Sequence, residues 1–250
     1  MTVDKTIGWL ESVLGDPSAT GQSEQTLRRR LLEALAAPAE PAKMTYDEFL
    51  AWADEDTLAE WVDGEIVMTS PASNRHQDLA GFLASVLRLF VETHGLGIVR
   101  IAPFQMKLES GREPDLLFVA AEHLSRLHDT YLEGPADLVV EIISPESIGR
   151  DRGEKFAEYA QGGVPEYWLI DPITQWSEFY RLEGNHYRPA FSGAEGQYHS
   201  LTVPGFWLRV EWLWQEPLPA VEDVLLEIGG EAYARGWLER LRRQGFLSEQ

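Results

Sequence analysis

Gly134–Ser144, with the sequence GPADLVVEIIS, is the stretch from which the organisation of this chain can be worked out. Within it, Leu138–Ile143 forms a short apolar run rich in valine and isoleucine, flanked by Pro135 and Pro145, which is typical of a buried strand. A single carboxylate, Glu141, interrupts the run. Removing water from an ionised glutamate is costly. The sequence therefore predicts that Glu141 has a cationic partner, a bound proton or a solvent-lined cleft.

The composition is that of a globular protein and excludes several classes. The chain has 250 residues, of which 44% are hydrophobic and 25% charged, enough for one large domain with an appendage. No apolar run approaches the ~20 residues of a membrane helix, and the start, MTVDKTIGWLESVLG, lacks the features of a signal peptide. The absence of cysteine excludes disulfides and thiolate metal sites. We therefore expect a cytoplasmic protein.

The chain is predicted to have three parts. Residues 1–43 form a helical appendage that ends in the linker AAPAEPAK, since apolar residues recur there at helical spacing. Residues 44–216 form the main domain, which opens on a capping box at Thr45 and Glu48. Residues 217–250 form a C-terminal helical tail with basic and aromatic residues.

The main domain reads as a mixture of helices and strands. The Asp63–Gly64 pair between AEWV and EIVM indicates a hairpin, and a helix follows from about Asn74 to Gly95. This order predicts a mixed α/β domain, with a sheet flanked by helices. The remaining elements we expect are strands at 98–108, 116–119, 138–143 and 167–170, a helix at 151–161, and a β meander over 178–214 in which Leu208, Val210, Trp212 and Trp214 share one strand face.

Carboxylates on two of these strands point to a metal site. Asp115 opens one strand and Glu141 lies inside the next strong one. If these strands are neighbours, both carboxylates can converge at one end of a sheet, and Mg²⁺ prefers such oxygen ligands. Asp151 and Lys155 are four residues apart, so they share a helix face. Lys155 can then reach the same cleft and orient or polarise an attacking water.

The chain resembles the Uma2 family of restriction-endonuclease-like nucleases, which belong to the PD-(D/E)XK superfamily. Any one of the matching motifs recurs by chance, but their order and spacing together are specific, and they span roughly residues 44–214. The matching pieces are AEWVDGEIV with the downstream His76, EPDLLFV, GPADLVVEIISPES, DRGEKFAEY and GGVPEYWLIDP.

The resemblance implies a sheet flanked by helices and a metal, Mg²⁺ or Mn²⁺, bound by Asp115 and Glu141. The wider superfamily keeps a lysine two residues after the glutamate, where this chain has Ile143 instead. The resemblance implies that Lys155 stands in for that lysine from the following helix. Glu60, in the AEWVDGE motif, corresponds to a further acidic position that can complete the metal site, so the predicted catalytic set is Asp115, Glu141, Lys155 and Glu60.

Each of these residues also has a structural interpretation. Asp115 can merely start a strand, and Glu141 can form a structural ion pair with Lys155 or with an arginine. Lys155 can be a solvated helix lysine. For His76 we favour a hydrogen-bonded, non-catalytic role. We assign the tryptophans to the core or an interface rather than to base stacking, namely Trp168, Trp207, Trp212 and Trp214.

The overall charge opposes the function that the motifs indicate. At a formal net charge of −20, the chain makes a poor general DNA binder, because nucleic-acid affinity comes mostly from Lys and Arg contacts to phosphate. Local positive charge is expected near the site from Arg112, Arg150, Arg152 and Lys155. We therefore predict weak or partner-dependent DNA binding.

Two functions from different classes follow. The first is a Mg²⁺-dependent nuclease that hydrolyses phosphodiester bonds, with DNA as the expected substrate. The second is a non-catalytic interaction or scaffold protein that retains the nuclease fold. Hydrolysis of another ester or a glycoside by paired carboxylates is a distant third. The apolar faces of residues 7–35 and the aromatic C-terminus further predict a homodimer, which light scattering at micromolar concentration would test.

Overall fold

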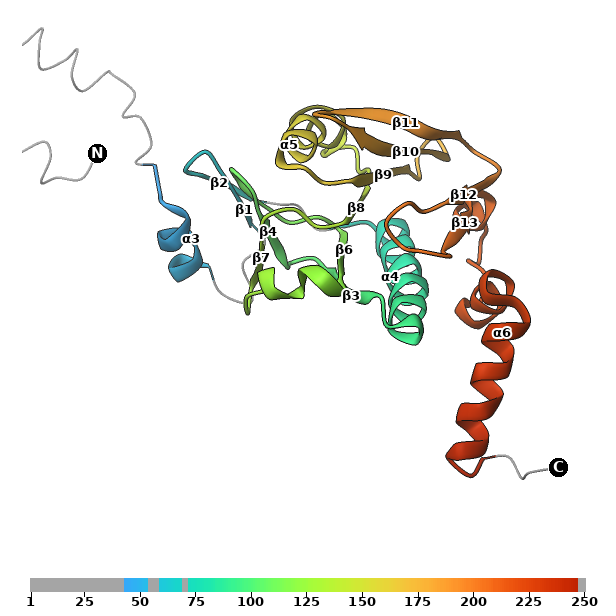
Figure 1. Ribbon diagram of the computed structural model, residues 1–250. Coiled ribbons are helices and arrows are strands. Elements are labelled where there is room, and N and C mark those ends of the chain that lie inside the picture. The colour runs from blue at the N-terminus through green and yellow to red at the C-terminus, as the bar shows by residue number, and fades with distance from the viewer. Residues whose placement is uncertain (1–42, 54–58, 69–71, 247–250) are drawn as a thin grey trace, which may run out of the picture.

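The fold is mixed α/β, as expected, with helices packed on a central sheet (Figure 1). The computed structural model describes residues 43–53, 59–68 and 72–246. The helices expected within residues 1–42 therefore lie outside the described residues. In the described part of the chain, no helix combines the length and the apolar character that crossing a membrane requires.

The central sheet has six strands in the order β11-β10-β9-β8-β6-β3. β8, the strand that contains Glu141, lies inside this sheet. It pairs antiparallel with β6, where Leu116 faces Val140, and parallel with β9. The strands are β3 (Gly97–Ile101), β6 (Leu116–Ala120), β8 (Leu138–Ile142), β9 (Glu166–Asp171), β10 (Trp176–Glu183) and β11 (His186–Gly193).

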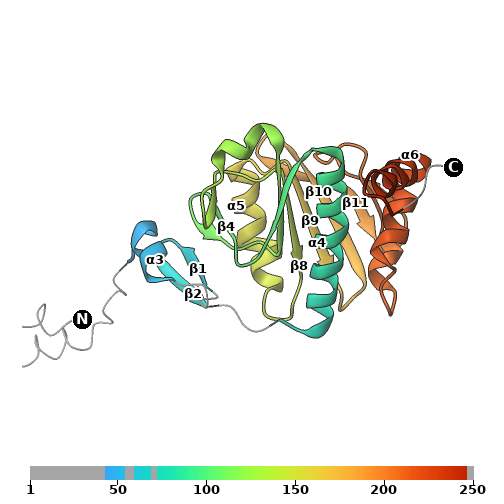
Figure 2. The ribbon, with the colours of Figure 1, turned by 90° about the horizontal axis from the view of Figure 1, so that it is seen from below.

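Helices cover both faces of the central sheet, which explains the continuous apolar sequence of β8. On one face, Leu138, Val140 and Ile142 pack in an apolar cluster with α4 (Asn74–His94). On the other face, Val139 and Ile143 pack in a cluster with α5 (Lys155–Gly162). Figure 2 shows the two helices on opposite sides of the sheet. Because side chains alternate along a strand, Glu141 faces the α5 side.

The ends of α4 follow the expected capping rules. The N-cap is Ser73, whose side chain accepts a hydrogen bond from the backbone N–H of His76. The helix ends at Gly95, which has φ 63° and ψ 31°. This left-handed conformation suits glycine because it has no Cβ. The capping therefore fixes the start of α4 and places His76 in its first turn.

A second sheet, of five strands in the order β2-β1-β5-β4-β7, brings Glu60 to the site. The Asp63–Gly64 hairpin is confirmed, since both residues have positive φ, 50° and 87°. The capping box of Thr45 and Glu48 at the start of α3 is also confirmed. The elements are α3 (Tyr46–Trp52), β1 (Ala59–Val62), β2 (Glu65–Met68), β4 (Gln105–Lys107), β5 (Gly111–Arg112) and β7 (Tyr131–Glu133).

The single strand expected over residues 98–108 is wrong. The chain leaves β3 at Ile101 and enters β4, in the other sheet, at Gln105. Pro103 lies between them, and a proline has no N–H to donate to a sheet ladder. The break therefore lets one segment connect the two sheets.

The strand face expected to contain Leu208, Val210, Trp212 and Trp214 is also wrong. Only Leu208 is in a strand, because β13 (Trp207–Arg209) ends there and the 3₁₀-helix η4 (Val210–Trp214) follows. Among the described strands, β13 pairs only with the three-residue strand β12 (Gln197–His199). The N–H of Val210 still donates to the carbonyl of Gly196, but the 3₁₀-helix then bonds locally, as between the N–H of Gln215 and the carbonyl of Trp212. Val210, Trp212 and Leu213 still enter the core.

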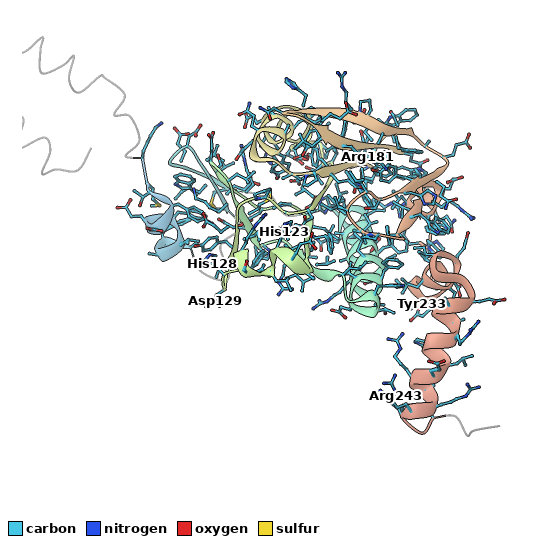
Figure 3. All side chains as sticks on the ribbon, in the orientation of Figure 1. His123, His128, Asp129, Arg181, Tyr233 and Arg243 are labelled. Carbon is cyan, nitrogen blue, oxygen red and sulfur yellow. The ribbon has the colours of Figure 1, made fainter. Side chains whose placement is uncertain are left out.

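The C-terminal helix α6 (Val221–Arg243) begins where a helix was expected. Val224 and Leu225 are buried in the core, whereas Figure 3 shows Arg243 at the far tip of the helix, away from the sheet. Trp237 and Leu238 are exposed. The homodimer stays a prediction, because the N-terminal apolar faces that motivated it lie outside the described residues. Another short 3₁₀-helix, η2 (Ala121–Arg126), follows β6.

A buried carboxylate, Glu166, attaches the β12–β13 segment to the central sheet. Glu166 Oε1 accepts a hydrogen bond from Trp168 Nε1 at 2.7 Å. Its Oε2 accepts bonds from the backbone N–H of Leu201 at 2.8 Å and of Thr202 at 2.9 Å, and from the hydroxyls of Ser200 and Thr202. Glu166 is 0% exposed, so these donors replace the water it lost on burial.

We expect Glu166→Gln to destabilise the fold. The glutamine keeps the shape, but its NH₂ group must face at least one of these donors, and a buried unsatisfied donor costs about 1–3 kcal/mol. Urea denaturation should show a loss of about 2 kcal/mol. Glu183→Gln, at an exposed position of the adjacent strand β10, is the matched control and should change little. Equal midpoints for the two variants would contradict this role of Glu166.

Candidate active site

One cavity brings together all four residues of the predicted catalytic set. The cavity has a volume of about 490 Å³. Glu60 reaches it from β1, Asp115 from the residue before β6, Glu141 from β8 and Lys155 from the start of α5. These positions are up to 95 residues apart in the chain, from Glu60 to Lys155, so only the packing of the two sheets and α5 unites them.

Glu141 is buried against α5 and has two partners there. Its Oε1 atom lies 3.0 Å from Lys155 Nζ and accepts a hydrogen bond of 2.8 Å from the hydroxyl of Tyr159. Burial raises the pKa of Glu141 well above its usual value, although the charge of Lys155 opposes this shift. Of the three alternatives predicted for this carboxylate, the structure shows a cationic partner, Lys155, and a position on the cavity wall.

Lys155 lies at the centre of the acidic cluster. Its Nζ is 3.1 Å from Glu60 Oε1, 3.0 Å from Glu141 Oε1 and 3.7 Å from Asp151 Oδ1. Burial alone would lower the pKa of Lys155, but the surrounding negative charges, that of Glu141 foremost, outweigh burial and raise it. Lys155 therefore keeps its proton, and the interpretation as a solvated helix lysine is wrong, because its side chain is only 7% exposed.

A π-helical turn presents Lys155 to the cavity. The helix expected from Asp151 starts instead with the π-helical turn η3 (Arg150–Glu154), in which the N–H of Lys155 donates to the carbonyl of Arg150, five residues earlier. Regular α-helix begins only at Lys155. Such wide turns occur frequently at functional sites. Asp151 still lies beside Lys155, as the i, i+4 spacing predicted.

Ile143, at the position of the superfamily's lysine, has no access to the cavity. It is 1% exposed and packs in the apolar cluster under α5. A lysine there would lose its hydration among apolar side chains. The chain therefore supplies the charge from the helix, at Lys155.

Asp115 is held by the neighbouring strand and by the start of α4. Its Oδ2 accepts a hydrogen bond of 2.7 Å from the backbone N–H of Ile142 and lies 3.2 Å from His76 Nε2. Burial alone would lower the pKa of His76, but the hydrogen bond and charge of Asp115 raise it. His76 is thus bonded, as expected, although it lies in the site itself. The register of β6 and β8 brings Asp115 and Glu141 to the same end of the sheet, as predicted.

Arg112 does not provide the free positive charge that was expected of it. It is 2% exposed, its NH1 lies 3.3 Å from Glu60 Oε2, and its Nε lies 2.8 Å from Glu158 Oε2. Burial would raise the pKa of Glu60, but Lys155 and Arg112 more than offset it and lower the pKa. Arg112 therefore stabilises the charge of Glu60.

The other two expected arginines differ from each other. Arg152 is paired with Glu178 on the sheet. Arg150 lines the cavity, and its Nε is buried without a hydrogen-bond partner among the described residues. Of the three, only Arg150 is placed to meet an anion in this cavity.

The carboxylates fit a divalent cation by their chemistry, without forming a complete ligand set. Asp115 and Glu141 offer the oxygen ligands that Mg²⁺ prefers. Asp151 Oδ1 is buried with no hydrogen-bond partner among the described residues, and the nearest cation, Lys155 Nζ, lies 3.7 Å away, so this oxygen has room for a closer ligand. Among residues 43–53, 59–68 and 72–246, no three acidic or histidine side chains are already arranged around one ion position. Mg²⁺ commonly takes only one or two protein carboxylates and completes its shell with water and substrate phosphate.

One organising residue, Tyr159, and the structural role of a second, Arg112, were missed in the sequence. Tyr159, which donates to Glu141, is four residues after Lys155 and so lies on the same face of α5. That spacing was a usable signal. The role of Arg112 had no such signal, because its carboxylate partner Glu60 is 52 residues away.

Glu113, on the wall of this cavity, makes stability depend on pH. Burial raises its pKa to about 7 from an ordinary value of 4.5, although a hydrogen bond from Gln105 opposes the shift. Between these values the folded chain binds more protons than the unfolded chain, so its stability falls as pH rises from 4.5 to about 7.

We expect Glu113→Gln, which resembles the protonated acid, to remove this part of the pH dependence. At pH 8 the variant should be more stable than the wild type by about 1–2 kcal/mol, while at pH 4 the two should agree. Chemical denaturation at both pH values measures this difference. Glu109→Gln, at an exposed position nearby, is the control, and a Glu113→Gln variant that follows the wild type at both pH values would refute the assignment.

Comparison with known proteins agrees with this fold and these motifs. An uncharacterized protein of Synechocystis sp., sll1609, is 25% identical over 146 residues, which cover 57% of this chain and 82% of that protein. A crystal structure described as a putative nuclease belonging to DUF820, from Anabaena variabilis, has a TM-score of 0.60 at 18% identity and covers 68% of this chain and 97% of its own. Residues 46–211 match the family Uma2, described as "Putative restriction endonuclease". The chain thus belongs to the Uma2 family and has its restriction-endonuclease-like fold.

Proposed function

We propose that this protein is a divalent-metal-dependent nuclease that hydrolyses phosphodiester bonds in DNA. The observation that carries the proposal is that Glu60, Asp115, Glu141 and Lys155 lie on the walls of one cavity. Membership of the Uma2 family and the similarity to a nuclease fold support a nuclease function in general. The choice of Mg²⁺, with Mn²⁺ as a substitute, rests on the oxygen-rich character of the site.

Each side chain has a distinct role in this proposal. Asp115 and Glu141 would hold the metal, which when bound activates a water and neutralises phosphate charge. Lys155 orients the attacking water and stabilises the charge that develops on the phosphate. Glu60, itself held by Arg112, keeps the lysine ammonium directed into the cavity. Arg150, whose buried Nε is free of partners in the described chain, would contact a phosphate oxygen.

The electrostatics support a weak enzyme–DNA complex. The site contains three buried or half-buried carboxylates around Lys155, and the chain as a whole has a formal net charge of −20. A polyanion is repelled at long range by such a protein, and low salt does not relieve like-charge repulsion. Binding therefore depends on local arginines, and the metal or a partner protein would strengthen it.

A specific observation also favours the second function, a non-catalytic interaction or scaffold protein. Glu141 and Lys155 are already paired, at 3% and 6% exposure. A closed pair of this kind can serve the fold alone. The two functions differ in how Glu141 responds to an added metal. Only the nuclease requires the Glu141 carboxylate to leave the Lys155 ammonium and bind a metal ion.

We expect Asp115→Asn and Glu141→Gln each to abolish specific Mn²⁺ or Mg²⁺ binding while leaving the fold intact. Both changes remove an anionic oxygen and keep the side-chain shape. Isothermal titration calorimetry measures the binding, and circular dichroism checks the fold. Asp78→Asn, an exposed carboxylate of α4 that does not line the cavity, is the matched control and should bind metal normally. Unchanged affinity in both site variants would exclude the proposed ligands.

We expect replacement of Lys155 to block the chemical step rather than metal binding. Lys155→Gln should reduce metal-dependent plasmid nicking by ~10²-fold or more, the scale for losing a positioned acid–base or electrostatic group. Metal affinity should stay equal or rise, because a nearby positive charge has been removed. Removing one partner of a buried ion pair costs about 3–5 kcal/mol, so nicking is compared at a temperature where both proteins are folded.

The same assay decides between the two functions. Nicking that disappears in Lys155→Gln and in Glu141→Gln, while both remain folded, supports the nuclease. Equal nicking by the wild type and both variants would identify a contaminating nuclease, and the scaffold function would then take its place.

A further inference from the structure

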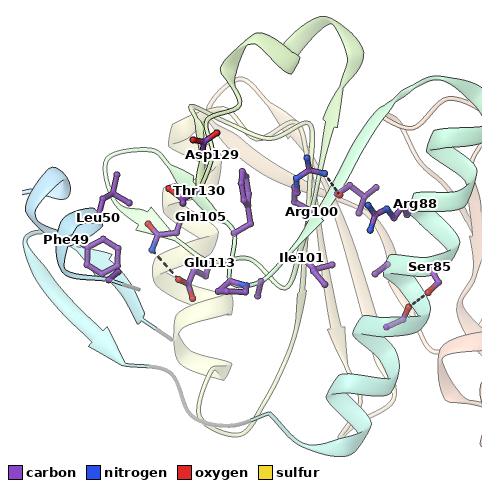
Figure 4. Close-up of a pocket in the computed structure, with 17 residues that line it drawn as sticks. Phe49, Leu50, Ser85, Arg88, Arg100, Ile101, Gln105, Glu113, Asp129 and Thr130 are labelled. Atoms are coloured by element: carbon purple, nitrogen blue, oxygen red, sulfur yellow. Dashed lines mark hydrogen bonds between the residues drawn. The ribbon is translucent and has the colours of Figure 1, made fainter. Parts of the chain in front are cut away.

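A second and larger cavity adjoins the candidate active site. Its volume is about 1010 Å³, and it lies between α3, α4 and β3. It shares Ala102, Pro103 and Glu113 with the active-site cavity, so these residues form a common wall. A molecule bound in one cavity is therefore adjacent to the other, and Figure 4 shows the labelled residues around this second space.

The lining of this cavity combines apolar surface with positive charge. Phe49, Leu50, Ile101 and Phe104 contribute apolar side chains, while Gln105 and Thr130 contribute polar ones. A nucleotide has the same combination of properties, because its base has flat apolar faces and its phosphate is anionic. Aromatic side chains and arginines together are the usual means of binding unpaired nucleotides.

Two arginines lie together on one side of the cavity. Figure 4 shows Arg88, from α4, and Arg100, from β3, on one side, with Asp129 and Glu113 away from them. The guanidinium of Arg100 lies 5.9 Å from the centre of the Phe104 ring. An anion at the arginines would therefore sit beside the aromatic surface and away from Asp129 and Glu113, the two carboxylates that line the cavity.

Both arginines are available for a ligand, unlike Arg112 and Arg152. Arg88 is paired with Glu92 one turn later on α4, but both side chains are more than half exposed, at 61% and 56%, and such pairs are weak. Arg100 NH1 donates to the carbonyl of Val99, and within the described residues it has no carboxylate within ion-pair distance. Neither arginine is buried between carboxylates as Arg112 is.

We propose that this cavity binds an unpaired nucleotide of the substrate strand, next to the phosphodiester that is cleaved. Arg88 and Arg100 contact its phosphate, and Phe104 contacts its base. A base can enter such a cavity only when it is not stacked in a duplex. The inference rests on the proposed function, and it specifies a preference for single-stranded or locally unpaired DNA over perfect duplex.

The test is DNA binding without cleavage. A short fluorescein-labelled single-stranded oligonucleotide and its duplex form are titrated with the full chain in EDTA, and anisotropy is read across a series of salt concentrations. Single-strand affinity falls by a slope of about −0.7 per phosphate contact on a double-logarithmic salt plot. We expect Arg88→Gln and Arg100→Gln each to weaken single-strand binding and to reduce that slope by about 0.7.

Two further variants separate base contact from charge. Phe104→Ala should weaken single-strand binding roughly ten-fold, the scale for losing one stacked base, while leaving the salt slope and duplex binding unchanged. Arg188→Gln, at an exposed arginine of β11 outside both cavities, should alter neither. Melting temperatures equal to that of the wild type verify that the arginine variants are folded.

The outcomes distinguish this site from the catalytic proposal. Arginine- and Phe104-dependent binding supports the nucleotide site even if the wild type does not nick DNA, in which case the catalytic proposal alone fails. No single-strand binding, equal slopes in all variants, or a preference for duplex would overturn the nucleotide site, while metal-dependent nicking that needs Lys155 would still support the catalytic proposal.

Discussion

The ion pair between Glu141 and Lys155 is the interaction on which the rest of the site depends. Glu141 is in the middle of a strand whose other residues belong to the apolar core, and at 3% exposure it has lost almost all of its water. A charged group in this position needs a compensating charge and hydrogen bonds. Lys155 and Tyr159, one turn apart on α5, provide both. The contacts that hold α5 on the sheet are therefore the same contacts that determine the charge state of the site.

The Glu141–Lys155 pair belongs to a larger network of charged side chains. Lys155 also contacts Glu60, Glu60 is bonded to Arg112, and Arg112 is bonded to Glu158 of α5. The network links the small sheet to the large one through buried charges rather than through apolar packing alone. Such networks are not an economical way to gain stability, since well-packed apolar residues of similar volume are often as good or better. Their presence is easier to understand if the cavity they border has a chemical task.

The arrangement also bears on our proposal that an acidic protein acts on a polyanion. Arg112 and Arg152 are engaged with buried or half-buried carboxylates, whereas Arg150 lines the first cavity and Arg88 and Arg100 line the second. These three arginines therefore place local positive charge on the walls of the two adjoining cavities. In our proposal this local charge favours substrates that can enter the cavities, while the net charge of −20 lowers general affinity for nucleic acid.

The local features of this chain could be predicted from the sequence because short-range physics determines them. The hairpin at Asp63–Gly64, the capping box at Thr45 and the buried strand of Glu141 depend on backbone preferences and on alternation within a few residues. The predicted members of the site, Glu60, Asp115, Glu141 and Lys155, do share one cavity, and the motif order was enough to name them. That they act together in catalysis remains our proposal.

Other features depended on the tertiary structure, because they involve partners far apart in the chain. The alternation of Val210, Trp212 and Trp214 is typical of a strand, yet the described part of the chain has no neighbouring strand that pairs with it. Arg112 has the local character of a free surface cation, but Glu60 and Glu158 lie across the fold and bind it. The cavity that joins Phe104 to Arg88 and Arg100 exists only because α3, α4 and β3 meet around it. The spacing of apolar residues along a segment indicates which of its side chains are buried. The partners of each charged side chain depend instead on how distant segments pack together.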